Sequence, residues 1–387
     1  MKLTLEIFGT LLVVVALLPW LRTYRWWVRV WDFPRVQIAV ALAAVAAAYV
    51  WLYGWGDGWP TAFLLALFAG LASELFHIRR FTPLWPKQAL GTREPSPRHS
   101  FSLLISNVRM ENTAYARFLK LVRENDPDLL LVNEPDERWA RYLAHELNPR
   151  YPHRIECPLP NTYGMLLYSK FQLLNPRVRY LVEQDVPSFR ATVAMPAGHT
   201  FELFTVHPQP PQFQRNTDTR EAELLQVARE VTTTPRPSIV VGDLNDVAWS
   251  RSTNLFRNVS GLLDPRIGRG FYNTYNAFIP LFRYSLDHIF YSPAFRLIRL
   301  KKLPAFGSDH FPIIIRLTYE PTAADEHEIP DPEPEEVAES HEAIRDGLEA
   351  ARELGTAPVS TSAGPPLTEA TPNQAPGADP DPDGAAR

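Results

Sequence analysis

The stretch SIVVGDLND, residues 238–246, decides how the rest of the chain is interpreted. Its β-branched residues predict a strand, and an unbroken apolar run is typical of a strand buried on both faces. Gly242 then permits a sharp turn, which leaves Asp243 and Asn245 at the carboxyl end of the strand, where layered α/β proteins bind ligands. A carboxylate and a carboxamide at this spacing can hold a water molecule and a metal-bound oxygen, although the pair is also common in simple turns.

Across residues 99–320, predicted strands repeatedly end beside a polar side chain. The residues concerned are Asn107, Glu134, His207, Asp243, Asn245, Asp287, Asp309 and His310. Each alone has an ordinary explanation as a turn residue, a cap, an arginine partner or a hydrogen-bonded histidine. Unrelated accidents would not place so many acid, amide and imidazole groups at successive strand ends, so the repetition indicates a site.

The residue types favour a hard cation. Carboxylate and amide oxygens suit Mg²⁺ or Mn²⁺, and the sequence has neither a cysteine cluster nor a His-x-x-x-His helix for zinc. The only cysteine is Cys157, so no intrachain disulfide is possible. Helical spacing over 114–124, 137–147 and 219–231, between the strands, predicts a mixed α/β domain.

Three apolar stretches open the chain, at 5–21, 36–53 and 60–76. Each has roughly the 17–20 residues needed to cross a bilayer, and Trp residues lie at the segment edges as an interfacial belt would place them. The first stretch lacks a small-x-small cleavage site, which disfavours a removed signal peptide. We therefore expect a lipid bilayer as a partner, with a buried three-helix domain as the alternative.

Charges in the loops predict the orientation of these segments. Basic residues flank one side of the spans: Arg22, Arg25, Arg29, Arg35, Arg79, Arg80 and Lys87. The only charged residue in the loop between the second and third spans is Asp57. The positive-inside rule then predicts a multi-pass protein of the inner or plasma membrane with a cytoplasmic catalytic domain, whereas Lys2 and the short amino-terminal segment argue for the reverse.

The ends of the soluble region differ in composition. Residues 81–98 contain several prolines and basic residues and are interpreted as a juxtamembrane linker. Residues 321–387 contain sixteen acidic and three basic residues and few large apolar ones, which predicts a disordered tail, with 337–354 as a transient helix. The expected domains are therefore a membrane domain (1–80), this linker, a catalytic domain (99–320) and the tail.

The order of these motifs resembles the endonuclease/exonuclease/phosphatase superfamily, and in particular a membrane-anchored bacterial branch of it. The resemblance covers about residues 100–319 and rests on Asn107, the pair Asn133-Glu134, His207, Gly-Asp-Leu-Asn, Leu-Asp-His and Ser-Asp-His in family order. It implies a four-layer α/β sandwich of the DNase I-like kind. The expected architecture of the whole chain adds three transmembrane α-helices before this domain and a disordered tail after it, neither of which the resemblance covers.

The resemblance also implies roles. Glu134 would be the main ligand of Mg²⁺ or Mn²⁺, with Asn107 and Asp309 helping to position the metal or its waters. Asp243 would orient or deprotonate the attacking water, and Asn245 would hold that water or the phosphate. His207 and His310 would donate to phosphoryl oxygens, with Asp287 fixing the His310 ring.

Three positions depart from, or only loosely match, the family pattern. Asn133 stands where many members have Gln, and the shorter amide shifts a supporting hydrogen bond without removing the Glu134 ligand. His288 follows Asp287 where DNA-repair members often carry Tyr, and Tyr163 is only a candidate for the family tyrosine.

The substrate stays open at this point. The expected activity is the hydrolysis of a phosphodiester or a phosphomonoester, and a nuclease-type activity is favoured. However, residues 99–320 contain only about four more basic than acidic residues, which is a small excess of positive charge for a nucleic-acid-binding domain. A lipid head-group phosphodiesterase or phosphatase is the alternative, because tethering raises the effective concentration of membrane substrates. Aromatic residues between the motifs, such as Trp249, Phe271, Tyr272 and Phe282, either form core, line a pocket or touch the bilayer. An inactive membrane-tethered binding module is the third hypothesis, and the oligomeric state is not predicted.

Overall fold

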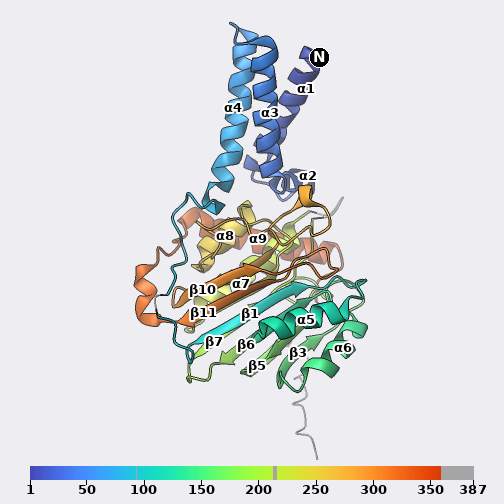
Figure 1. Cartoon of the computed structure of the whole chain (residues 1–387), viewed down its shortest axis with the longest axis vertical. Coiled ribbons are helices and arrows are strands. Elements are labelled where there is room, and N and C mark those ends of the chain that lie inside the picture. The colour runs from blue at the N-terminus through green and yellow to red at the C-terminus, as the bar shows by residue number, and fades with distance from the viewer. Residues whose placement is uncertain (93, 212–215, 359–387) are drawn as a thin grey trace, which may run out of the picture.

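The computed structural model describes residues 1–92, 94–211 and 216–358. Figure 1 shows an apolar bundle of α1, α3 and α4 that stands on one side of a larger α/β domain. The chain enters the α/β domain after α4, and the last described helix packs on that domain.

The amino-terminal bundle is built from helices of nearly unbroken apolar sequence. Its elements are α1 (Lys2–Leu17), η1 (Leu18–Trp20), α2 (Trp26–Arg29), η2 (Val30–Asp32), α3 (Arg35–Tyr53), α4 (Trp59–Ile78) and η3 (Arg79–Phe81). Three helical segments, Lys2–Trp20, Arg35–Tyr53 and Trp59–Phe81, are long and apolar enough to cross a membrane. Leu42, Tyr49 and Leu64 pack inside the bundle, whereas Val40, Trp51 and other large apolar side chains face outward.

Two sheets form the centre of the α/β domain. The six-stranded sheet has the order β10-β11-β1-β2-β4-β3, and the five-stranded sheet has the order β5-β6-β7-β8-β9. The strands are β1 (Ser100–Asn107), β2 (Leu129–Asn133), β3 (His153–Cys157), β4 (Met165–Ser169), β5 (Gln172–Arg179), β6 (Ser188–Ala194), β7 (Thr200–Thr205), β8 (Ser238–Asp243), β9 (Asp287–Tyr291), β10 (Phe295–Lys302) and β11 (Ile313–Tyr319). Among the strands of the described residues, β1 pairs with β2 and β7 with β8 in parallel, and the other paired strands are antiparallel.

The alternation of side chains along each strand decides which residues lie between the sheets. Leu103 and Ile105 of β1, and Ile239 and Val241 of β8, belong to the core shared by the two sheets. Leu104 and Val240, at the intervening positions, face the outer helices instead. Because successive residues of a strand point to opposite faces, Asn107 and Asp243 continue the inward series at the strand ends.

Helices cover both outer faces, which confirms the expected four-layer sandwich. On one face, α5 (Tyr115–Asn125) and α6 (Glu137–Leu147) cover β1, β2 and β4 with a cluster that includes Phe118 and Trp139. On the other face, α7 (Asp218–Thr233), α8 (Arg251–Ser260) and α9 (Pro334–Glu353) cover β7, β8 and β9.

The prediction of disorder from Pro321 is wrong for the part of that segment that the structure describes. Residues Pro321–Glu326 form η5, and α9 packs on α7. Gly347 permits this contact, because a Cβ there would lie 2.4 Å from the Cβ of Ala222. Composition misled the prediction, since the small residues of one helix face bury little area but allow close approach; residues 359–387 lie outside the described residues.

The linker predicted at 81–98 is held against the domain for part of its length. Backbone hydrogen bonds join Leu297 N to Leu90 O (3.0 Å) and Thr92 N to Leu297 O (3.2 Å). The bundle is also attached directly, because Trp249 Nε1 donates to Asp32 O at 2.7 Å. These contacts fix the lower end of the bundle relative to the sheets.

Candidate active site

A hydrogen bond between two polar side chains, one from each sheet, joins the sheets at one end of the sandwich. Asn107 ends β1, and its Nδ2 donates to Asp243 Oδ2 at 3.1 Å across the space between the sheets. The same Nδ2 donates to Glu134 Oε1 at 2.7 Å, and Asn107 Oδ1 accepts from Arg109 N at 2.9 Å. Asn107 therefore joins the principal residues of both sheets, which is the role of an orienting group.

The backbone around Asp243 requires the residues found there. A Cβ on Gly242 would lie 1.8 Å from Val206 O, so only glycine lets β8 approach the chain after β7 at this point. Asn245 adopts a left-handed conformation with φ 49°, which Asn tolerates better than most residues. Its backbone N donates to Asp243 Oδ1 at 3.0 Å, and its Nδ2 donates to Pro208 O at 2.9 Å.

Glu134 reaches the site because its backbone turns out of the strand. It follows β2 with φ 61°, and its N donates to Gly164 O at 2.9 Å. Gly164 is needed for that contact, since a Cβ would lie 2.1 Å from Pro135 O. Burial, with the charges of Asp243 and Asp309, raises the pKa of Glu134 to about 7 against the opposing effects of Asn107 and His310. The site thus gathers carboxylates that repel one another.

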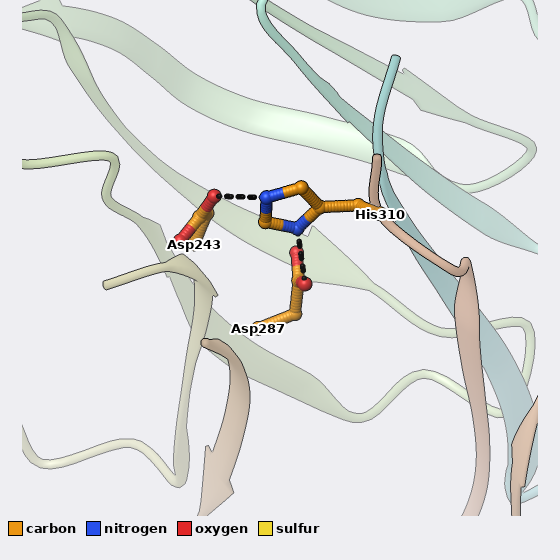
Figure 2. A group of neighbouring side chains, drawn as sticks. All are labelled: Asp243, Asp287 and His310. Carbon is orange, nitrogen blue, oxygen red and sulfur yellow. Dashed lines mark hydrogen bonds and ion pairs between the residues drawn. The ribbon is translucent and has the colours of Figure 1, made fainter. Parts of the chain in front are cut away.

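His310 lies between two carboxylates, as Figure 2 shows. Its Nδ1 is 2.9 Å from Asp287 Oδ2, and its Nε2 is 3.5 Å from Asp243 Oδ2. Burial alone would lower the pKa of His310, but Asp287 and Asp243 raise it to about 10. For Asp243 burial acts the other way, and the neighbouring His310 and His207 rings hold its pKa below the ordinary value.

These three side chains are close enough together to suggest a metal, with ligand atoms within 4.8 Å of one another. However, each nitrogen of His310 already faces a carboxylate oxygen, and a ring protonated at both nitrogens has no lone pair for a metal. We therefore describe Asp287, His310 and Asp243 as a hydrogen-bonded and ion-paired series rather than as ligands.

His207 completes the site from the end of β7. Its Nε2 is 3.9 Å from Asp243 Oδ2, and its buried Nδ1 has no hydrogen-bond partner among the described residues. The ring lies 5.8 Å from that of Tyr163, centroid to centroid, so the structure brings this candidate tyrosine beside the site. Burial lowers the pKa of His207, which favours the neutral ring.

Asp309 enters from the loop before β11 and stays partly exposed, as do Glu134 and Asn245. Ser308, its neighbour, donates from Oγ to Asn107 O at 2.8 Å and so ties this loop to the end of β1. All eight residues predicted from the sequence therefore come together at one end of the sandwich. We call them the strand-end site.

Phe282 was noted in the sequence as one of several aromatic residues between the motifs, but Tyr275 and a hairpin at residues 275–284 beside the site were not predicted. The ring of Tyr275 lies 5.0 Å from that of His310, and Ala277 N donates to Asp309 O at 2.7 Å. No strand-end motif marks these residues; these contacts, together with the β-bridges of Tyr275 to Tyr284 and to His310, place them beside the site.

A second buried polar cluster lies directly behind the site. It consists of Arg220, Asp246, Asp264, Arg266 and His288, and we call it the arginine cluster. Arg266 Nη2 donates to Asp264 Oδ2 at 2.8 Å and contacts His288 Nδ1 at 2.7 Å. Burial and Arg266 lower the pKa of His288 to about 3, so this neutral histidine has a structural role.

The unusual Asn133 is fully buried at the end of β2. Neither its side-chain oxygen nor its nitrogen has a hydrogen-bond partner among the described residues. The shorter amide therefore does not form the supporting hydrogen bond that the resemblance led us to expect.

This chain is similar to a known protein family and to several solved structures. Residues 104–310 match the model of the Endonuclease/Exonuclease/phosphatase family. Similar solved structures include an endonuclease/exonuclease/phosphatase from Bacteroides vulgatus, with 18% identity and a TM-score of 0.48 over 57% of this chain and 99% of that chain. A mannosyl-6-phosphatase from Bacteroides thetaiotaomicron has 18% identity and a TM-score of 0.46 over 57% and 100% of the two chains.

The catalytic domain of human nocturnin has 16% identity and a TM-score of 0.47 over 58% of this chain and 96% of its own. A comparison with curated proteins found no match. The family match covers more than half of the chain and includes all eight residues of the strand-end site, from Asn107 near its start to His310 at its end. The chain therefore belongs to the endonuclease/exonuclease/phosphatase family.

Proposed function

We propose that this chain is a membrane-anchored, divalent-metal-dependent phosphoesterase in which Asp243 activates the attacking water. One observation carries the proposal: Asp243 is fully buried, yet it is oriented by Asn107 and Asn245 and faces two histidines. A carboxylate fixed on several sides and kept ionised is what a general base requires.

The donor set fits a hard cation. Glu134 and Asp309 are the partly exposed carboxylate residues of the site, and burial together with the charges of Asp243 and Asp309 disfavours ionised Glu134. A divalent cation held by Glu134 and Asp309, as Mg²⁺ or Mn²⁺, would offset phosphoryl charge and lower the pKa of a bound water. Asn107 would serve this pair indirectly, by orienting Glu134 through the 2.7 Å hydrogen bond.

The side chains then divide the reaction between them. Asp243 accepts a proton as water attacks phosphorus, the bond from phosphorus to the leaving oxygen breaks, that oxygen takes up a proton from the solvent, and Asp243 afterwards releases its proton to the solvent. His310, held by Asp287 at 2.9 Å, and His207, with its unpaired Nδ1, supply donors for phosphoryl oxygens. Asn245 helps to hold the water or the phosphate. Such positioning and charge stabilisation are the main requirements of phosphoryl transfer.

The apolar bundle supports membrane anchoring. Large apolar side chains face outward from all three spans, including Ile7 (53% exposed), Trp51 (87%) and Leu65 (60%). A soluble three-helix domain would leave these side chains in water, which disfavours the alternative. The basic loop between α1 and α3 lies at the end of the bundle that meets the α/β domain, and by the positive-inside rule this supports a cytoplasmic location for that domain.

A direct test uses the purified full chain in detergent with bis-p-nitrophenyl phosphate and p-nitrophenyl phosphate. We expect hydrolysis with Mg²⁺ or Mn²⁺ and none with EDTA. The relative rates on the two substrates will show whether the enzyme prefers a phosphodiester or a phosphomonoester. Glu134→Gln should lose this activity, whereas Glu111→Gln, at a residue that is 62% exposed, is the matched control and should keep it. Equal activity with EDTA, or in Glu134→Gln, would refute the proposal.

A nuclease is the second candidate, and a basic group near the site favours it. Arg109 follows Asn107 by two residues and is 42% exposed, so it is available to contact a phosphate. Plasmid DNA in the same assay would be cut in a metal-dependent way if this candidate is correct.

A further inference from the structure

The hairpin at residues 275–284 is held together by backbone and side-chain hydrogen bonds. At its base, Tyr275 N donates to Tyr284 O at 2.9 Å, and Asn276 N donates to Phe282 O at 3.1 Å. At its tip, η4 (Pro280–Phe282) is preceded by Phe278, whose N donates to Asn276 Oδ1 at 2.8 Å. The hairpin therefore has a defined conformation.

The tip of this ordered hairpin is apolar and exposed. Phe278 is 53% exposed, Ile279 48%, Leu281 64% and Phe282 47%. Other aromatic residues between the motifs behave differently, since Trp249 and Phe271 pack ring against ring, with centroids 5.4 Å apart. Four adjacent exposed apolar side chains on a stabilised turn mark a contact surface rather than unfilled core.

The surroundings of the tip identify what it contacts. Gln37 Nε2, in the first turn of α3, donates to Leu281 O at 2.6 Å, and the rings of Phe33 and Tyr284 lie 5.5 Å apart. The hairpin therefore touches the end of a membrane span, and Figure 1 shows its light-orange loop beside α2, below the bundle. A bilayer that covered the three apolar helices would end near the first turn of α3, so it would be the apolar phase nearest to the tip.

Basic side chains accompany the tip, as expected at an anionic membrane surface. The Arg109 guanidinium lies 5.7 Å from the centroid of the Phe278 ring, and Arg283 Nε donates to Asn276 O at 3.3 Å. Apolar residues flanked by Arg are typical of segments that lie in the interface of an anionic leaflet. A partner protein would explain the exposed apolar area, but not its continuity with the end of α3.

The base of the same hairpin borders the strand-end site, through the contacts of Tyr275 with His310 and of Ala277 with Asp309. We propose that the hairpin inserts its tip into the leaflet in which the domain-side ends of α1, α3 and α4 lie, so that the strand-end site acts on the phosphoester of a lipid in that leaflet. The substrate class in this statement rests on the proposed phosphoesterase function, whereas insertion of the hairpin does not.

Insertion is tested by placing a fluorophore on the tip. Cys157 is the only cysteine, so Cys157→Ser provides a background for Leu281→Cys labelled with a nitrobenzoxadiazole dye. The full chain is reconstituted in vesicles of phosphatidylcholine and phosphatidylglycerol. Ile329→Cys, an exposed apolar position in the segment after β11 (47% exposed), is the negative control, and Val40→Cys on the outer face of α3 (65% exposed) is the positive one.

We expect spin-labelled acyl chains to quench the dye at 281 and at 40 but not at 329, and aqueous iodide to quench in the reverse order. Equal quenching by lipid at 281 and 329 would overturn the proposal. Protection of position 281 from both quenchers would also overturn it, because another protein chain would then cover the tip.

The substrate class is tested with the double variant Leu281→Ser/Phe282→Ser. In vesicles that also contain phosphatidic acid, the wild type should release water-soluble phosphorus when Mn²⁺ is present. The variant should release it at least about tenfold more slowly, because it loses apolar area that the bilayer would bury. Hydrolysis of bis-p-nitrophenyl phosphate should be the same in both, and Ile329→Ser should behave as wild type.

The two proposals fail in different ways. Metal-dependent hydrolysis of the soluble diester without release from any vesicle lipid would overturn the lipid substrate and leave the phosphoesterase standing. Absence of hydrolysis of every substrate would refute the phosphoesterase, while the fluorescence measurement would still decide whether the hairpin inserts.

Discussion

The strand-end site and the arginine cluster are neighbours that differ in how their buried carboxylates are compensated by positive charge. They share two sequence motifs, since Asp243 and Asp246 lie in one turn and Asp287 and His288 are adjacent. In the arginine cluster each carboxylate has an arginine: Asp264 pairs with Arg266 at 2.8 Å and Asp246 with Arg220 at 3.3 Å. In the strand-end site the carboxylates face one another and two histidines.

This difference distinguishes buried polar groups that stabilise the fold from buried polar groups that bind a ligand. A buried carboxylate with a hydrogen-bonded arginine has its charge compensated within the protein. A group of carboxylates without such compensation costs stability and gains from an added cation, which is typical of functional sites. The two clusters should therefore respond in opposite ways to the loss of a charge.

The largest effect is expected in the strand-end site. Asp243→Asn removes the general base and should lower kcat for bis-p-nitrophenyl phosphate by about 10²–10⁴-fold, the usual contribution of such a group. Loss of a charge should not destabilise the fold at Glu134, because burial and the charges of Asp243 and Asp309 already disfavour its ionised form, so Glu134→Gln should not unfold at a lower temperature than the wild type. A kcat within a few-fold of wild type would remove Asp243 from the mechanism.

The opposite result is expected in the arginine cluster. Arg266→Met leaves Asp264 buried without its partner and should destabilise the fold by about 3–5 kcal/mol, seen as a lower midpoint of denaturant unfolding. Arg299→Met, at an exposed arginine of β10, is the matched control and should unfold like the wild type. If Arg266→Met unfolded like this control, the arginine cluster would not have the structural role assigned to it.

Glu223, a buried carboxylate outside both clusters, extends the comparison to the pH dependence of stability. Burial and the charge of Glu183 raise the pKa of Glu223 on α7 to about 8, against the opposing effect of Arg179. The folded state then holds a proton that the unfolded chain releases near the ordinary value of 4.5, so this contribution to stability is lost as pH rises from 4.5 to about 8.

Glu223→Gln removes that dependence. Its midpoint of thermal unfolding relative to the wild type should be higher at about pH 8 than at about pH 5. Glu124→Gln, at a residue that is 54% exposed, should show no such change. A difference between Glu223→Gln and the wild type that is independent of pH would show that Glu223 titrates normally.

Much of the site follows from local sequence because strand ends and side-chain alternation are local properties. Asn107 and Asp243 were identified at strand ends, and the inward series of Ile105 and Val241 explains why both lie between the sheets. The helix at 137–147 was also predicted with the observed bounds. The family match and the two-sheet architecture confirm the family and the fold expected from these motifs.

The remaining features depend on contacts between distant segments. No local pattern shows that β1 lies between β2 and β11, or that the two sheets bring Asn107 within 3.1 Å of Asp243. The hairpin was not predicted because its position depends on Gln37 of α3 and on Asp309. The helix α9 was underestimated because an acidic, Pro-rich composition conceals one face of small residues that fits α7.

The most direct test of the central claim is the binding of Mn²⁺ by the full chain, measured by titration calorimetry in detergent. An uncompensated carboxylate site predicts saturable binding by the wild type and by Glu111→Gln. In Glu134→Gln the affinity should fall by at least about tenfold, as expected when a ligand position is weakened. Equal affinity in Glu134→Gln, or no binding by the wild type, would contradict the assignment of the strand-end site as a metal-dependent centre.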